Sequence, residues 1–173
     1  SEANASVRLA IYTAPSASMP GYAYEGTSGK RIVGGATGLT LMETKDHYIV
    51  SYAENNSFIS RADSLSGISL GVPVFPEKCV ADRMRTALLW CGAPMSLPPA
   101  AYPDVWYDGS VSFDDSLWQI DVENGSASPV SVLGENAREP IDGTGLDISD
   151  TGDLLIFINK RNGALWAQTL QSL

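Results

Sequence analysis

The sequence predicts an all-β fold made of short antiparallel strands. No window of about a dozen residues keeps apolar side chains at helical spacing without interruption by Gly, Pro or β-branched residues. Short runs that favour strands recur along the whole chain instead, and turn-forming pairs separate them. At 173 residues, the chain is long enough to bury a core without help from a metal ion or a disulfide bond.

Each expected strand ends where turn chemistry begins. In chain order, the expected strands are residues 7–12, 22–25, 39–42, 48–53, 58–62, 68–72, 79–81, 87–91, 117–122, 130–133, 146–148, 154–159 and 164–169. The separating turns include Ser28-Gly29, Asn55-Asn56, Ser66-Gly67, Asn124-Gly125, Thr151-Gly152 and Asn162-Gly163. Residues 34–38, which are rich in Gly, are expected to be a connection between strands. The pattern favours an antiparallel meander.

One unit of sequence recurs along the chain. A strand, a tight turn and a more apolar strand are found at residues 38–52, 78–91 and 145–158. A further strand with an aromatic residue near its start follows each pair, and it carries Phe58, Trp118 or Trp166. Four-stranded units repeated at roughly 40 residues are the sequence signature of a β-propeller blade.

The clearest copy of this unit runs from Gly145 to Trp166 and resembles the WD40-like or TolB-type propeller repeats of bacterial cell-envelope and secreted proteins. The turn from Ser149 to Asp153 is similar to the Ser-Pro-Asp-Gly-Lys turn of that family, although it lacks the Pro. The resemblance covers about residues 37–170. It implies a propeller in a bacterial extracytoplasmic protein, which is periplasmic, cell-surface or secreted, and it says almost nothing about activity.

The blades add up to less than a full ring. Residues 1–173 form one propeller segment, with a partial blade at 7–33, blades at 38–72 and 77–133, and a three-stranded blade at 145–169. That is about three and a half blades, whereas a closed ring needs about four to eight. We expect part of a larger ring, completed by a second chain or by missing N-terminal blades. A compact four-bladed ring is the alternative.

The two cysteines flank one hairpin turn. In a simple register Cys79 and Cys91 face each other on neighbouring strands, which favours a disulfide bond. Two small buried thiols are the alternative. Together with the single histidine, His47, they are too few to hold a metal ion, so no metal and no cofactor is expected.

The segment 92–111 is an insertion between the second and third strands of its blade, and it is rich in Pro and aromatic residues. Tyr102, Trp106 and Tyr107, with Asp104 and Asp108 beside them, are the candidate binding residues, because aromatic rings on a stiff loop suit recognition. The alternative is that the rings fold back and cap the core of a blade. Turn formation accounts for most Asp residues in this part of the chain and at 147–153.

The net charge and the motifs of the sequence disfavour several classes of function. The net charge of −9 disfavours binding to nucleic acid or to an anionic membrane, and no apolar run is long enough to span a bilayer. No Gly-x-Ser-x-Gly motif is present. The expected function is a non-enzymatic propeller module for protein or glycan recognition, or for scaffolding. The alternative is part of a propeller-type glycosidase, lyase or peptidase whose catalytic residues lie partly outside this chain.

Overall fold

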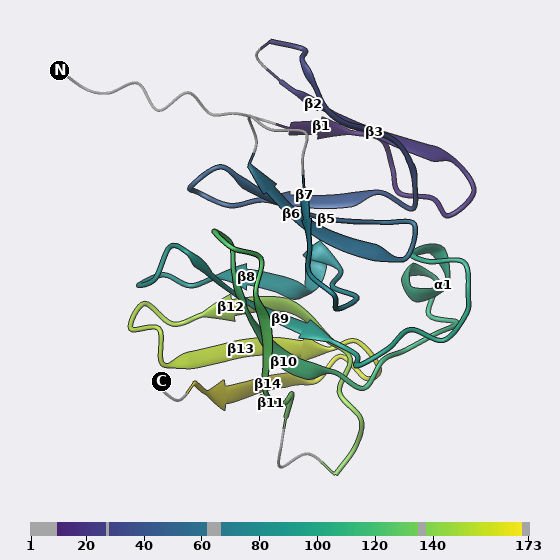
Figure 1. Ribbon diagram of the computed structural model, residues 1–173. Helices are drawn as coiled ribbons and strands as arrows, with labels where there is room; N and C mark the ends of the chain where they lie inside the picture. Colours follow the sequence, from purple (N-terminus) through teal and green to yellow (C-terminus); the bar gives the residue numbers. More distant parts are fainter. Residues whose placement is uncertain (1–9, 27, 62–66, 135–137, 171–173) are drawn as a thin grey trace, which may run out of the picture.

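The computed structural model describes residues 10–26, 28–61, 67–134 and 138–170, and its strands form four antiparallel sheets (Figure 1). The strands are β1 Ala10–Tyr12, β2 Pro20–Glu25, β3 Arg31–Thr37, β4 Thr40–Glu43, β5 Tyr48–Ala53, β6 Asn56–Arg61, β7 Gly67–Ser69, β8 Cys79–Ala81, β9 Leu88–Ala93, β10 Ser116–Asp121, β11 Ala127–Val132, β12 Gly143–Ile148, β13 Leu154–Asn159 and β14 Leu165–Thr169. The helical segments in this part of the chain are a 3-10 turn, η1 (Pro76–Lys78), and a short helix, α1 (Asp104–Tyr107). Residues 7–9 and 62, which belong to expected strands, lie outside the described residues.

Each sheet contains only strands that follow one another in the chain. The two middle sheets, β4–β7 and β8–β11, have four strands each, whereas β1–β3 and β12–β14 have three. All pairings within the sheets are antiparallel and join neighbours in sequence. This up-and-down order is that of propeller blades, and it confirms the predicted all-β fold.

Apolar side chains fill the space between consecutive sheets. Ala23 and Ile32 pack on Leu41 and Ile49 between the first two sheets. The second and third sheets share a cluster of Val50, Ile59, Leu70, Val72, Val74, Cys79, Leu89, Cys91, Ala93, Trp118, Ile120 and Val122. The third and fourth share Trp90, Leu117, Leu133, Ile141, Leu146, Ile148, Leu155, Phe157 and Leu170. The middle sheets therefore bury both faces.

The alternation along β9 shows how one strand serves two clusters. Leu89 and Cys91 belong to the cluster shared with β4–β7, while Trp90 between them belongs to the cluster shared with β12–β14. Successive side chains of a strand point to opposite faces, so a strand buried on both sides must be apolar throughout. This is why residues 87–91 read as a continuous apolar run in the sequence.

The predicted disulfide bond is confirmed. Cys79 on β8 and Cys91 on β9 are directly opposite each other in the register, their Cα atoms are 4.1 Å apart, and their sulfur atoms are bonded. The bond links the first two strands of the third sheet.

The expected connection at residues 34–38 is wrong for most of its length, because β3 continues to Thr37. The ring of Tyr22 lies over Gly34, so that a Cβ atom there would be 2.7 Å from Cδ1 of the ring. Glycine in this strand therefore makes room for an aromatic side chain on the neighbouring strand. The register between β2 and β3 also shifts between Gly21 and Tyr22.

The four sheets are stacked in chain order, and β1–β3 and β12–β14 lie at opposite ends of the stack (Figure 1). Among the described residues, no buried cluster joins these two end sheets. Within this part of the chain the stack is thus open, in the sense that its two end sheets share no buried core.

Candidate functional site

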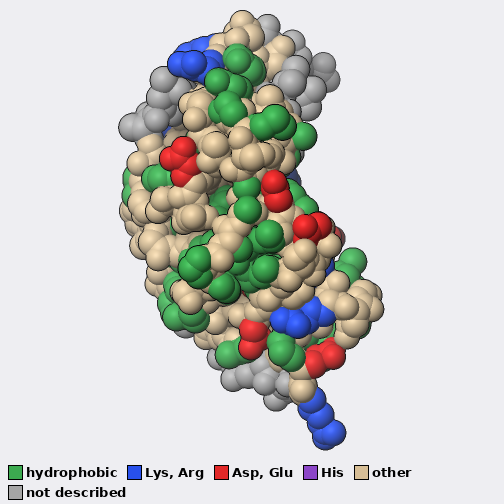
Figure 2. All heavy atoms as spheres, turned by 90° about the vertical axis from the view of Figure 1, so that its right-hand side faces the viewer, with side chains coloured by type: hydrophobic (Ala, Val, Ile, Leu, Met, Phe, Trp, Pro, Cys, Tyr) green, Lys and Arg blue, Asp and Glu red, His purple; other side chains and the backbone are tan. Residues whose placement is uncertain are grey.

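The insertion between β9 and β10 lies along one side of the stack, beside the second and third sheets (Figure 1). Its helix α1 starts directly after Pro103, and Asp104 lies in the first turn, where a carboxylate is favoured. Figure 2 looks onto this side and shows hydrophobic side chains gathered in the middle of the face.

Two of the candidate binding residues are buried. Tyr102 is 5% exposed and Trp106 is 3% exposed. Both belong to an aromatic cluster with Tyr52, Phe75 and Phe113, in which the ring centroids of Phe75 and Trp106 are 5.3 Å apart. Both rings are therefore folded back onto the core, as in the capping alternative, and a binding role for them stays a prediction. They cap the end of β5 and the segment before η1.

The other three candidate residues are at the surface or near it. Tyr107 is 41% exposed, and its hydroxyl is hydrogen-bonded to Glu77. Asp104 accepts a hydrogen bond from the backbone N–H of Ala17, at 2.9 Å, in the loop between β1 and β2. Asp108 accepts one from the N–H of Ser110, and hydrogen bonds from Ser110 lower the pKa of Asp108. The two carboxylates thus position the insertion, and a binding role for the three residues stays a prediction.

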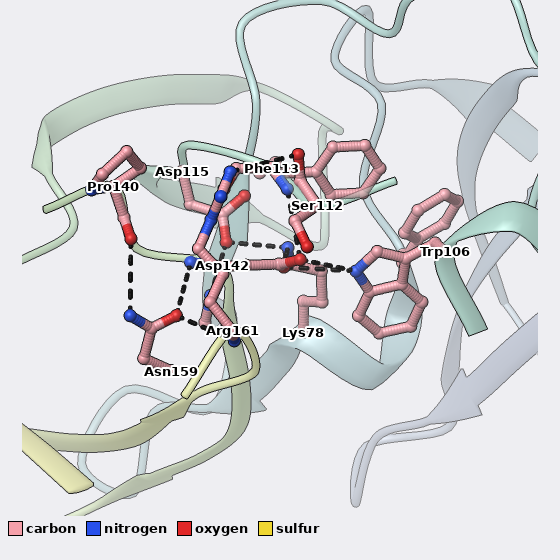
Figure 3. A network of polar contacts seen from close by, with 12 residues as sticks. Lys78, Trp106, Ser112, Phe113, Asp115, Pro140, Asp142, Asn159 and Arg161 are labelled. Atoms are coloured by element: carbon pink, nitrogen blue, oxygen red, sulfur yellow. Dashed lines mark hydrogen bonds and ion pairs between the residues drawn. The ribbon is translucent and has the colours of Figure 1, made fainter. Parts of the chain in front are cut away.

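A fully buried ion cluster lies beside the rings of Trp106 and Phe113 (Figure 3). The ammonium of Lys78, on η1, is 2.7 Å from Asp115 Oδ2 and 2.6 Å from Asp142 Oδ1, and all three side chains are 0% exposed. Trp106 donates its indole N–H to Asp142 Oδ2 at 3.0 Å. Lys78 Nζ also lies 4.7 Å from the centroid of the Phe113 ring.

Backbone groups complete the cluster. The N–H of Phe113 donates to Asp142 Oδ2 at 3.1 Å, and the N–H of Gly143 donates to Asp115 Oδ2 at 2.7 Å. The second oxygen of Asp115, Oδ1, is buried without a hydrogen-bond partner. Burial raises the pKa of Asp115 to about 6, although the nearby Lys78 opposes this shift. Two carboxylates share one cation here, so the site holds a surplus negative charge out of water.

Sequence reasoning missed this cluster. Lys78, Asp115 and Asp142 are far from one another in the chain, and no motif links them. A lysine within the apolar stretch 72–81 was the one available signal, because a lysine is seldom fully buried unless it is paired. The cluster joins η1, the insertion and the start of β12. Because it is closed to solvent, its ion pairs and hydrogen bonds serve to hold these three segments together.

A pocket of about 440 Å³ lies between the insertion and the second sheet. Its lining residues are Asn55, Asn56, Ser57, Ser69, Gly71, Val72, Pro73, Ser96, Leu97, Pro98, Pro99 and Tyr102. Every side chain in this lining is uncharged at neutral pH. The volume falls within the range of about 300 to 1,000 Å³ that is common for small-molecule sites. Of the candidate binding residues, Tyr102 is the one that borders the pocket.

The remaining acidic groups have turn or surface roles. Asp153 accepts a hydrogen bond from the hydroxyl of Ser149 within the β12–β13 turn, and Arg83 pairs with Asp147 at 3.0 Å and with Asp150. Within the described ranges, no group of three or more His, Cys, Asp or Glu side chains is arranged to hold a metal ion. No helix in the same ranges is long and apolar enough to cross a membrane.

No protein-family model and no curated protein matches the chain. Among solved structures, it is similar to the β-propeller domain of Cps50 (Swd1) from Myceliophteria thermophila, at 11% sequence identity and a TM-score of 0.48. The similarity covers 88% of this chain and 50% of that one, so the chain spans about half the length of that structure. The identification of blades therefore rests on the strand order and sheet packing of the chain itself.

Proposed function

We propose that this chain is a non-enzymatic propeller module that recognises a neutral ligand, a glycan or a segment of protein, in the pocket beneath the insertion. The observation that carries the proposal is the uncharged lining of that pocket. Hydroxyl and amide groups of Asn55, Asn56, Ser69 and Ser96 offer donors and acceptors, and Pro and Leu side chains offer apolar contact. Such a mixture fixes the orientation of a ligand that carries no charge.

The same lining argues against catalysis in this pocket. General acid–base and nucleophilic mechanisms need a titratable group within hydrogen-bond reach of the substrate. Tyr102 is the one ionisable residue of the lining, and burial raises its pKa, which keeps it protonated. The buried carboxylates Asp115 and Asp142 are 0% exposed, so a substrate does not reach them. The enzyme alternative, in which the catalytic residues lie partly outside this chain, would therefore need a site other than this pocket.

The location that fits best is outside the cytoplasm. The disulfide bond between Cys79 and Cys91 supports this, since such bonds persist in oxidising compartments. The resemblance of residues 145–166 to TolB-type repeats adds a bacterial cell-envelope or secreted setting to the proposal.

The module is further proposed to be part of a larger ring, completed by a second chain or by further blades. Its support is the open stack, in which the last sheet has three strands while the middle sheets have four. An uncovered strand edge readily pairs with another strand.

Binding arrays test the recognition role. The labelled protein would be applied to printed arrays of neutral glycans, acidic glycans and extended peptides, beside a Ser96→Trp variant that fills the pocket from an exposed position. A Ser110→Trp variant is the matched control, because Ser110 is also exposed on the insertion but does not line the pocket.

The expected result is binding by the wild type and by the Ser110→Trp control, and a loss of at least tenfold in the Ser96→Trp variant. Neutral probes should be selected over acidic ones, because the lining offers no cation and the chain has a net charge of −9. The proposal fails if no probe distinguishes the wild type from the Ser96→Trp variant.

A further inference from the structure

Two strands of the sheet at the end of the stack, β13 and β14, carry apolar side chains on both faces. Leu155 and Phe157 on β13 are 0% exposed and pack towards β8–β11. The residues between them point the other way, and there Ile156 pairs with Ala167 and Ile158 pairs with Leu165 on β14. Leu165 is 73% exposed and Ile158 is 41% exposed. On β12 the outward side is polar, because Asp147 stands opposite Ile156 and Thr144 stands opposite Ile158, so the apolar patch is confined to β13 and β14. A strand with one face in water normally carries polar residues there, and β13 does not.

The two middle sheets show what packs on an apolar sheet face in this molecule. Each of them carries apolar residues on both faces, and each face is covered by a neighbouring sheet. The outward sides of β13 and β14 are aliphatic as well, and none of the buried clusters formed by the described residues covers them. Exposed aliphatic groups in a contiguous patch mark an interaction surface, and the neighbouring interface suggests another sheet as its cover.

The opposite end of the stack offers a complementary face. Ala23 and Ile32 point into the molecule, so Tyr22, Tyr24 and Arg31 lie on the outward side of β1–β3. Tyr24 is 39% exposed and stands directly opposite Arg31 on the neighbouring strand. These rings provide a flat apolar area with a guanidinium beside it.

Charge differs between the two ends. Lys30 and Arg31 are exposed at the β1–β3 end. Asp147, Asp150 and Asp153 are exposed around the β12–β13 turn of the other end sheet, where Arg83 pairs with the first two. The cations of that sheet, Lys160 and Arg161, are at its β13–β14 turn. The carboxylates around the β12–β13 turn are thus opposite in charge to Lys30 and Arg31 at the β2–β3 turn. Such complementarity favours contact between unlike ends over contact between like ends.

We propose that a second copy of this chain docks head to tail, with its β1–β3 face on the β12–β14 face of the first copy. Because both copies carry both faces, two copies can meet at both ends, and four sheets from each close one ring. This inference rests on the proposal that the chain is part of a larger ring, and it names a second copy of the same chain as the partner that completes the ring. It does not depend on ligand binding in the pocket.

The mass in solution is the first measurement. Light scattering after size exclusion, over a range of protein concentrations, should give twice 18.4 kDa for the wild type. A double Ile158→Lys and Leu165→Lys variant should be monomeric, because each charge would be placed in the apolar contact. Met95→Lys is the matched control, since Met95 is 67% exposed on the insertion, and it should remain dimeric.

The direction of docking needs a second measurement. Tyr24→Cys and Ile158→Cys proteins, mixed and oxidised, should form a disulfide between unlike copies at least tenfold faster than either forms one alone. An Arg31→Glu variant should weaken the dimer, and so should high salt.

Three results would overturn the proposal. The first is a mass of 18.4 kDa for the wild type at every concentration, which would leave blades of another chain as the cover. The second is a dimer that the double lysine variant does not disrupt. The third is cross-linking that favours like copies. Circular dichroism and the melting temperature would verify that the lysine variant is folded, as expected for changes at exposed positions, and its binding to the arrays would report on the pocket separately.

Discussion

Trp106 donates its indole N–H to Asp142 at 3.0 Å, and so ties the insertion of the third sheet to the residue that precedes the fourth. The ring also packs on Phe75 in the aromatic cluster. One side chain thus combines apolar packing with a charged hydrogen bond in a site that excludes water.

Removing this ring should destabilise the fold. A Trp106→Ala variant is expected to lose about 3 to 5 kcal/mol in free energy of unfolding, because a large buried side chain leaves a cavity. Trp106→Phe should lose less, since the ring is kept and the hydrogen bond to Asp142 is lost. Tyr107→Ala, at a position 41% exposed, is the control and should change the stability little. Urea denaturation followed by tryptophan fluorescence measures all three. Equal stabilities for the wild type and Trp106→Ala would show that the insertion does not cap the core.

The buried cation should matter more than either of its partners. Lys78→Met leaves Asp115 and Asp142 without a counterion and is expected to cost about 3 to 5 kcal/mol. Asp115→Asn removes the surplus carboxylate and keeps the pair of Lys78 and Asp142, so its cost should be smaller. Chemical denaturation at pH 7 compares the variants. A larger loss of stability for Asp115→Asn than for Lys78→Met would contradict the view that Asp115 carries the surplus negative charge.

The same carboxylate predicts a pH dependence. The pKa of Asp115 is about 6 in the folded chain and 3.8 without its surroundings, so the folded state holds this proton more tightly. The contribution of Asp115 to stability therefore rises as the pH falls from above 6 towards 3.8, and it is least favourable at neutral pH. Free energies of unfolding would be measured at pH 7, 6, 5 and 4. The stability of the wild type relative to Asp115→Asn should increase as the pH falls from 7 to 4. A constant difference between the two proteins would refute the shift.

The disulfide bond gives the fourth prediction. Thiol titration of the unfolded, unreduced chain should find no free thiol, because both cysteines are bonded to each other. Reduction is expected to lower the free energy of unfolding by about 2 to 4 kcal/mol. A Cys79→Ser, Cys91→Ser double variant should show the same loss with and without reductant. Two titratable thiols in the wild type would contradict both this bond and part of the argument for an extracytoplasmic location.

The strands could be predicted where local sequence decides them. Residues 48–53 and 154–159 are strands with the expected bounds, because apolar runs end there at turn residues. β3 escaped prediction because its two adjacent glycines look like a loop, whereas Gly34 makes room for the ring of Tyr22 and Gly35 has a positive φ within the strand. The cysteine pair was predictable because one short hairpin sets its register.

The site depends on contacts that local sequence does not encode. Lys78, Asp115 and Asp142 meet only after three separate segments are packed together. The aromatic residues of the insertion were recognisable as unusual, but whether they turn outward or inward depends on the space beside Phe75 and Tyr52. The pocket likewise combines residues 55–57, at the β5–β6 hairpin, with residues 96–99 of the insertion.

The insertion also changes how the molecule is expected to come apart. A stack in which each sheet touches only its neighbours behaves as a one-dimensional chain of units, and such chains can open one unit at a time. Here Asp104 accepts a hydrogen bond from the N–H of Ala17, in the loop between the first two strands of the first sheet. Trp106 donates one to Asp142, directly before the fourth sheet. The insertion thus forms hydrogen bonds with both ends of the stack. Unfolding of either end sheet would break one of these bonds and disturb the insertion. We therefore expect the four sheets to unfold as a single cooperative unit.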